Sequence, residues 1–179
     1  MNWAEMAAAQ PRLAEIGQQR LLGKGVVLVA TIRADGTPRV SPVEPFVLSG
    51  VLWLSMLWGS TKAADLLRDP RILVHSIITN RDGGEGEFKI RGLAQPEEDR
   101  DVQRRYAAAV AEALGWNPEP GHFHLFGVDI RHVTFIRYDD STGDQTVVMW
   151  PPGREYIRRG TGATTLGPPE PVTAVLAAS

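Results

Sequence analysis

The residues best suited to binding chemistry are consecutive and lie at the junction between a predicted strand and a predicted helix. They are Trp58, Gly59, Ser60, Thr61 and Lys62. A helix start has free backbone N–H groups, the two hydroxyls can hydrogen-bond, and the lysine supplies a positive charge. Together these groups suit a phosphate. An ordinary capped helix with a solvent-facing lysine would show the same residues, so the motif alone leaves both interpretations open.

Three further basic residues could surround the same phosphate. Arg39 begins a strand that Pro42 interrupts, and Lys89 and Arg91 lie on a later, half-exposed strand. If the fold brings these strands together, they would gather with Lys62 around one anion. A barrel of antiparallel strands would do so.

The remaining reactive side chains do not form a recognisable catalytic or metal site. His122, His124 and His132 could bind a metal or act as the axial ligand of a haem, but no carboxylate at ligand spacing completes a metal site. A structural role is therefore favoured, and the haem role stays open. No serine lies in a G-x-S-x-G elbow, which argues against a hydrolase. We predict no catalytic residue and no metal ligand.

Composition limits the class of protein. The chain has 179 residues, a formal net charge of -2 and no cysteine. This length predicts one domain over residues 1–179, and the charge gives no general attraction to nucleic acid or to anionic membranes. No segment has the length of apolar sequence that a membrane span needs, and no leader is evident, so the cytoplasm is the expected location.

Helical periodicity covers three segments. Residues 3–22 are predicted to be helical with a new start at Pro11, and this N-terminal segment, residues 1–24, should cover one end of a barrel. A short helix is predicted over residues 61–68. The strongest helical pattern runs from Pro96 to Leu114 and ends at Gly115.

Strand patterns dominate the rest of the chain and predict a mainly β fold with helices, a closed or split β-barrel. The β-branched run 26–32 is expected to be buried on both faces, and the Asp35-Gly36 turn leads into a strand over 39–48 that Pro42 and Pro45 place at an edge or bulge. The other predicted strands cover residues 51–57, 72–79, 87–94, 122–138, 146–150 and 155–159. The tail, residues 161–179, is expected to be ordered only against a partner surface.

The order of these motifs resembles a known family. The stretches ATIRADGTPRVSPV (30–43), VLWL (51–54), STKAADLLRDPR (60–71) and IRGLA (90–94) are similar to the pyridoxamine 5′-phosphate oxidase-like FMN-binding split barrels, which include flavin and deazaflavin oxidoreductases. The resemblance spans residues 25–114. It implies an oxidoreductase that acts on a small molecule, whose identity the sequence does not give.

The resemblance also implies a homodimer with a flavin at each subunit interface. The phosphate of the flavin would contact Arg39, Ser60, Thr61 and Lys62, and Lys89 would approach the flavin. The backbone of Val40, Ser41, Pro42 and Val43 and of Leu54, Ser55 and Met56 would lie along the isoalloxazine ring. Trp58 could supply a flat apolar wall.

Two departures argue against vitamin B6 oxidation itself. Thr61 stands where the true oxidases carry an arginine, and their C-terminal substrate motif is missing from residues 160–179. FMN is therefore the expected cofactor of an oxidoreductase with another substrate. A deazaflavin coenzyme is the alternative, and Arg12, Arg20 and Lys24 could bind its longer acidic tail. A non-catalytic protein that binds a cofactor or haem is the alternative from another class.

Overall fold

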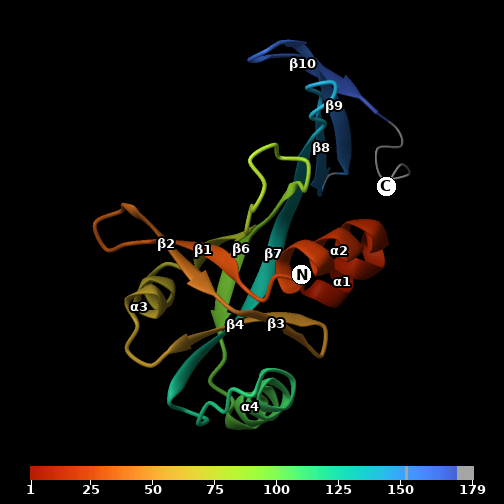
Figure 1. Cartoon of the computed structure of the whole chain (residues 1–179). Helices are drawn as coiled ribbons and strands as arrows, with labels where there is room; N and C mark the ends of the chain where they lie inside the picture. Colours follow the sequence, from red (N-terminus) through yellow and green to blue (C-terminus); the bar gives the residue numbers. More distant parts are fainter. Residues whose placement is uncertain (152, 173–179) are drawn as a thin grey trace.

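The computed structural model of the protein describes residues 1–151 and 153–172 (Figure 1). In this part of the chain, ten antiparallel strands form one sheet. The strands are β1 (Val27–Ile32), β2 (Pro38–Val43), β3 (Pro45–Leu48), β4 (Val51–Leu57), β5 (Arg71–Ser76), β6 (Glu87–Pro96), β7 (Phe123–Tyr138), β8 (Gln145–Trp150), β9 (Arg154–Gly162) and β10 (Thr165–Pro171). The mainly β prediction is confirmed.

The sheet curls into a barrel that stays open along one seam. Its strands follow the order β10-β9-β8-β7-β6-β5-β1-β2, while β4 pairs with β3 and with the first half of β7. No ladder joins β2 to β3 or β4 among the described strands. The seam therefore leaves the outer edge of β2 unpaired, and the fold is a split barrel.

The predicted strand over residues 39–48 is in fact two strands. The chain breaks at Glu44, so that β2 pairs with β1 and β3 pairs with β4. The prolines on either side, Pro42 and Pro45, lack the N–H donors that a continuous ladder would need. The edge position predicted from these prolines is confirmed.

Successive side chains of β1 alternate between buried and partly buried, as in a barrel strand with one face toward the core. Val27, Val29 and Thr31 are buried in the barrel, whereas Leu28 and Ala30 on the outer face are only partly buried. The prediction that both faces are buried was wrong. β-branched residues pack well on either face of a strand. The β-branched sequence of β1 therefore does not reveal whether a second element of the same chain covers its outer face.

Three short helical segments close one end of the barrel, as predicted. They are α1 (Trp3–Ala9), α2 (Pro11–Gly17) and a π-helical turn η1 (Gln18–Leu22). Asn2 and Glu5 form a capping box at the start of α1, and Pro11 occupies the first turn of α2. Trp3, Met6, Leu13 and Leu21 enter the main core.

The other two helices flank β4 and its junction. Helix α3 (Thr61–Arg68) has the predicted bounds, but α4 (Arg100–Leu114) starts at Arg100 rather than Pro96, because residues 87–96 continue as β6 and Asp99 caps the helix. Gly115 ends α4 with a φ of 71°. Tyr106 and Val110 of α4 form a second core with Trp53, Phe123 and Leu125.

The chain ends in an arm that projects from the barrel (Figure 1). β7 runs for 16 residues, and its second half pairs with β8, followed by β9 and β10. Residues 165–171 of the predicted tail form β10, which pairs with β9 of the same chain. Residues 173–179 of the predicted tail lie outside the described residues. Prolines in β10 limit further pairing at this edge.

The close approach of β6 and β7 at Gly92 gives a test of the fold. A Cβ at Gly92, beside the irregularity between Arg91 and Gly92, would lie 2.2 Å from the backbone oxygen of Asp129. Gly92→Ala is expected to lower the free energy of unfolding by about 1–3 kcal/mol, because backbone must shift to make room. Gly167→Ala, whose nearest contact is 3.5 Å, is the control and should change it by less than about 0.5 kcal/mol. Equal urea midpoints for the two variants would contradict the packing described for β6 and β7.

Candidate functional site

The junction after β4 folds as a capped helix start with two donors left over. Gly59 turns the chain with a φ of 75°, and the Ser60 Oγ accepts a hydrogen bond from the N–H of Ala63 at 3.4 Å. In the described part of the chain, the N–H groups of Thr61 and Lys62 have no acceptor. The Ser60 hydroxyl therefore caps α3, and two free N–H groups remain for an anion, as at many helix starts.

Lys62 reaches across the open seam to the unpaired edge of β2. Its Nζ donates to the carbonyl oxygen of Pro42 at 3.3 Å. In an antiparallel strand the backbone groups of alternate residues face the same side, so the backbone of Val40 shares this edge with that of Pro42. The edge thus presents carbonyl acceptors and the N–H of Val40, next to a lysine ammonium.

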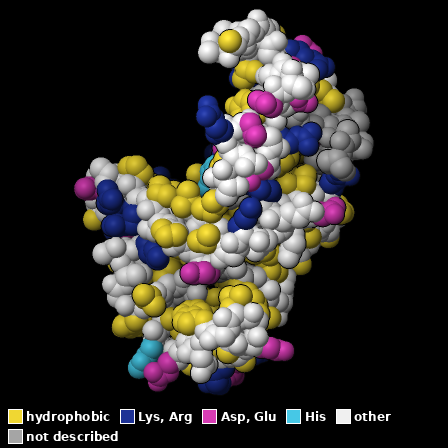
Figure 2. All heavy atoms as spheres, in the orientation of Figure 1, with side chains coloured by type: hydrophobic (Ala, Val, Ile, Leu, Met, Phe, Trp, Pro, Cys, Tyr) yellow, Lys and Arg dark blue, Asp and Glu magenta, His cyan; other side chains and the backbone are white. Residues whose placement is uncertain are grey.

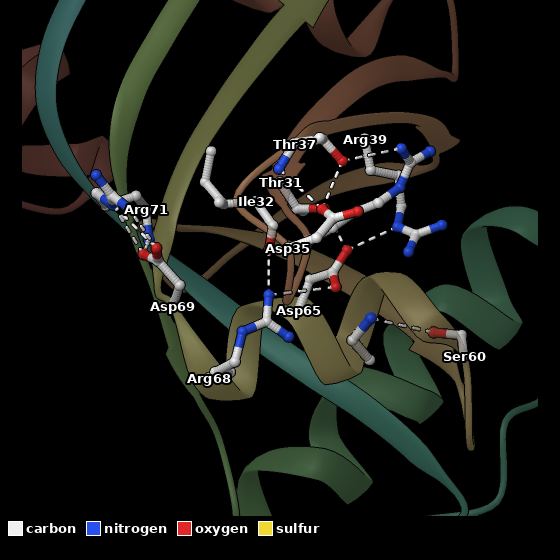
Figure 3. A network of polar contacts seen from close by, with 12 residues as sticks. Thr31, Ile32, Asp35, Thr37, Arg39, Ser60, Asp65, Arg68, Asp69 and Arg71 are labelled. Carbon is white, nitrogen blue, oxygen red and sulfur yellow. Dashed lines mark hydrogen bonds and ion pairs between the residues drawn. The ribbon is translucent and has the colours of Figure 1, made fainter.

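Arg39 is fixed by a buried carboxylate on α3 (Figure 3). Its Nε donates to Oδ2 of Asp65 at 2.6 Å, and the Thr31 Oγ1 donates to the same oxygen at 2.9 Å. The Arg68 Nη2 lies 3.5 Å from Oδ1 of Asp65 and also donates to the Ile32 carbonyl. The Asp65 side chain is 5% exposed and that of Arg39 is 24% exposed. One acid therefore holds two arginines beside α3.

Asp65 is ionised despite its burial. Burial by itself raises the pKa of a carboxyl, but the hydrogen bonds from Arg39 and Thr31 and the charge of Arg39 outweigh it and lower the pKa of Asp65 below 3.8. Two guanidinium groups against one carboxylate leave the network with a net positive charge. Among the described residues, neither terminal nitrogen of Arg39 has a hydrogen-bond partner.

A cleft of about 630 Å³ is lined by Lys62 and by Pro42, which its ammonium contacts. Its polar floor is the Tyr106 hydroxyl, which donates to the Ser55 Oγ at 3.0 Å, and burial raises the pKa of that phenol. Walls of the cleft come from β3, β4, the end of α4 and the start of α3. The lining residues are Gly25, Pro42, Glu44, Phe46, Ser55, Met56, Leu57, Lys62, Tyr106, Leu114 and Trp116. Volume and apolar walls are typical of a small-molecule site.

The structure places four predicted contact residues in this cleft: Pro42, Ser55, Met56 and Lys62. Val43 and Leu54 are instead buried in the core, so only their backbone could face a ligand. Val40 is 61% exposed on the outer face of β2, whereas Ser41 lies on the same face as Arg39.

Trp58 lies away from the cleft. Its ring stacks on His124 with the centroids 4.6 Å apart and 7° between the planes, and both residues line a separate cavity of about 430 Å³. Burial lowers the pKa of His124, so the imidazole is neutral at pH 7. The structure thus assigns Trp58 to a different surface from the predicted phosphate junction.

Lys89 and Arg91 do not join the Arg39 and Lys62 pair. They lie on β6, three strands from β2, and line a recess of about 190 Å³ with His132. Lys89 also pairs with Glu87 at 2.9 Å. Within one chain, strands β5 and β1 stand between β6 and β2, so this structure does not bring the four cations expected around one anion together.

Two site residues were missed by sequence reasoning. Asp65 follows Lys62 by three positions, which puts both on one side of a helix, so the spacing contained a signal. Tyr106 meets Ser55 across 51 residues, and nothing local in the sequence indicates that contact. No group of three potential metal ligands occurs among residues 1–151 and 153–172, and no helix there has the length and apolarity of a membrane span.

A family model described as pyridoxamine 5′-phosphate oxidase matches residues 15–137, well over half of the chain. The chain belongs to the pyridoxamine 5′-phosphate oxidase family. The matched segment contains the last residues of α2, the open seam and α3, and it ends one residue before the end of β7. A comparison with curated proteins finds no match.

Solved structures support the same fold. A NimC/NimA family protein from Clostridium acetobutylicum aligns with a TM-score of 0.58 and 18% identity, over 82% of this chain and 94% of that one. An F420 reductase aligns at 0.51 and 18% identity, over 65% and 94%. A heme binding protein from Mycobacterium smegmatis aligns at 0.51 and 20% identity, over 67% and 52%. At these identities the similarity shows the fold of the pyridoxamine 5′-phosphate oxidase family and no more.

The Asp65 network makes the stability of the protein depend on pH. Because the folded-state pKa lies below 3.8, ionised Asp65 stabilises the fold above that pH, and the contribution disappears as the pH falls through the folded-state pKa. Asp65→Asn is expected to lower the free energy of unfolding at neutral pH by about 1.5–3 kcal/mol, the range for hydrogen bonds to a charged group. The difference between wild type and variant, measured by urea unfolding, should shrink at progressively lower pH. A difference that stays constant down to pH 2.5, or about that, would contradict an ionised Asp65.

Proposed function

We propose that this protein is a flavin-dependent oxidoreductase that binds FMN in the cleft beside α3, between two copies of the chain. The observation that carries the proposal is the set of donors around the start of α3, next to a cleft that Lys62 lines. The N–H groups of Thr61 and Lys62 and the terminal nitrogens of Arg39 have no acceptor among the described residues, and the Lys62 ammonium donates only to the Pro42 carbonyl there. Membership of the pyridoxamine 5′-phosphate oxidase family supports the choice of a flavin.

The residues present fit the two ends of FMN. A phosphate would accept hydrogen bonds from the start of α3 and from Arg39, with charge assistance from Lys62. The unpaired β2 edge, with the Val40 N–H and the Pro42 carbonyl, offers one donor and one acceptor to the edge of a planar ring. Met56, Phe46 and Trp116 would exclude water from the ring.

The bound flavin would supply the electron or hydride transfer, so the chain needs no acid–base pair of its own. Its residues would bind and orient the coenzyme, and the Val40 N–H would stabilise negative charge at the ring edge. The acceptor or donor is a small molecule whose identity the cleft does not specify.

FMN is favoured over a deazaflavin coenzyme because one of the N-terminal basic residues already has partners within the protein. Arg20, one of three residues expected to bind a longer acidic tail, instead bonds Glu85 at 3.0 Å and the Ile77 carbonyl at 2.9 Å. Arg20 therefore binds the segment between β5 and β6. The F420 reductase among the similar structures keeps the deazaflavin as the alternative to be tested.

Haem binding is a second candidate because of His132. Its Nδ1 lies 3.3 Å from the Pro151 carbonyl, an arrangement that leaves Nε2 free as a ligand, and Lys89 and Arg91 could pair with propionates. The recess is only about 190 Å³, below the usual range for cofactor pockets. FMN in the larger cleft is therefore preferred.

Titration of the purified protein with FMN tests the proposal. Lys62→Ala should weaken FMN binding by about 1.5–3 kcal/mol, the range for a contact with a charged group, as measured by quenching of flavin fluorescence. Arg104→Ala, which removes an exposed charge on α4 away from the cleft, is the control and should leave the affinity unchanged. A wild type that binds no FMN, or a Soret band after addition of haem without any flavin binding, would refute the flavin assignment.

The outer face of β1 and β2 is the surface proposed for the second copy. Val40 is 61% exposed there, and Ala30 and Leu73 lie beside it across the ladder. Figure 2 shows hydrophobic side chains gathered over this part of the barrel, below the arm. A patch of this kind is typical of an interface.

Val40→Lys is expected to shift the protein from dimer to monomer in analytical ultracentrifugation, because it places a charge in the apolar patch. Leu67→Lys, a change at another exposed apolar residue on α3, is the control and should leave the mass unchanged. Monomeric wild type that still binds FMN tightly would contradict a site between subunits.

A further inference from the structure

Arg39 has a long, flexible side chain on an edge strand, yet it is held in one place. A guanidinium that binds a phosphate with two parallel hydrogen bonds must be oriented, and orientation costs side-chain entropy if it occurs only on binding. In this structure the Nε of Arg39 already donates to Oδ2 of Asp65 at 2.6 Å. The side chain is therefore ordered before any ligand arrives.

Asp65 is itself fixed from three directions. Thr31 donates to Oδ2 at 2.9 Å, Arg68 approaches Oδ1 at 3.5 Å, and the side chain, in the middle of α3, is only 5% exposed. An anion so placed cannot turn to follow a mobile arginine. Arg39 must instead conform to Asp65, and Figure 3 shows the contact between them.

We infer that Asp65 is a positioning residue of the anion site: it holds Arg39 by Nε and leaves both terminal nitrogens free for the phosphoryl group of the ligand. This inference rests on the proposed function, because it needs an anion at the start of α3. By its charge alone the Asp65 carboxylate would oppose phosphate binding, whereas this role makes it favour phosphate binding.

Charge and position make opposite predictions for the same variant. A carboxylate near an anion site repels the anion, so its neutralisation in Asp65→Asn should strengthen phosphate binding if charge alone matters. If Asp65 positions Arg39, the same change should weaken phosphate binding, since the amide holds a guanidinium less firmly. The sign of the change therefore separates the two roles.

The test compares FMN with riboflavin, which has the same ring and no phosphate. For the full-length wild-type protein, FMN should bind more tightly than riboflavin. For Asp65→Asn, we expect FMN affinity to fall about tenfold while riboflavin affinity changes by less than about twofold. A general loss of structure would weaken both ligands, so the ratio of the two dissociation constants reports on the phosphate end alone.

Further variants complete the measurement. Asp69→Asn removes a partly exposed carboxylate at the end of α3 that bonds Arg71 and not Arg39, and it should leave both affinities unchanged. In an Arg39→Ala background, Asp65→Asn should no longer weaken FMN binding, because the group that it positions is gone. If Asp65→Asn does not fold, Thr31→Val removes one anchor of the carboxylate and should lower FMN affinity selectively by a smaller factor.

The outcomes are distinct. FMN affinity that is unchanged or higher in Asp65→Asn, with riboflavin affinity intact, would overturn the positioning role while leaving the flavin site in place. Equal loss of FMN and riboflavin binding would show a structural role only and would also overturn it. A wild type that binds neither ligand would remove the proposed function and this inference together.

Discussion

The open seam beside β2 is the constraint from which the site follows. A strand edge in a barrel must be paired, covered or protected, and here two prolines in β2 remove donors while α3 packs against both β1 and β4. The helix that covers the seam also begins there, so its free N–H groups and Lys62 meet the unpaired carbonyl of Pro42. The strand edge and the helix start, each incompletely hydrogen-bonded, thus lie together at the mouth of one cleft.

Charge balance along α3 determines what that cleft can hold. Asp65 is buried between two arginines and stays ionised, so the network has a fixed geometry and a net positive charge. Elsewhere the lining is mostly apolar, and its polar groups are Glu44 and the Tyr106 hydroxyl of α4, which donates to Ser55 of β4. An anionic group attached to a flat, largely apolar body fits this combination, and a phosphorylated flavin has that shape.

The arm extends the sheet beyond the barrel. Residues after 137 lie outside the segment that matches the pyridoxamine 5′-phosphate oxidase family, yet β8, β9 and β10 continue the same sheet. A three-stranded extension gains little core of its own, and among the described residues of β8, β9 and β10 only Val147 and Val148 have buried side chains. Its stability therefore depends on β7, the long strand shared with the barrel.

Local sequence determined most elements, because turns, caps and periodicity act within a few residues. The Asp35-Gly36 turn, the Ser60 cap and the helix from Thr61 to Arg68 follow from residues next to one another. Other features needed the tertiary structure. The break at Glu44, the half-exposed outer face of β1, the pairing of β10 and the separation of Lys89 from Lys62 depend on which strands become neighbours. Asp65 and Tyr106 became site residues only when packing brought distant segments together, since burial and long-range contacts are properties of the folded chain and not of any local pattern.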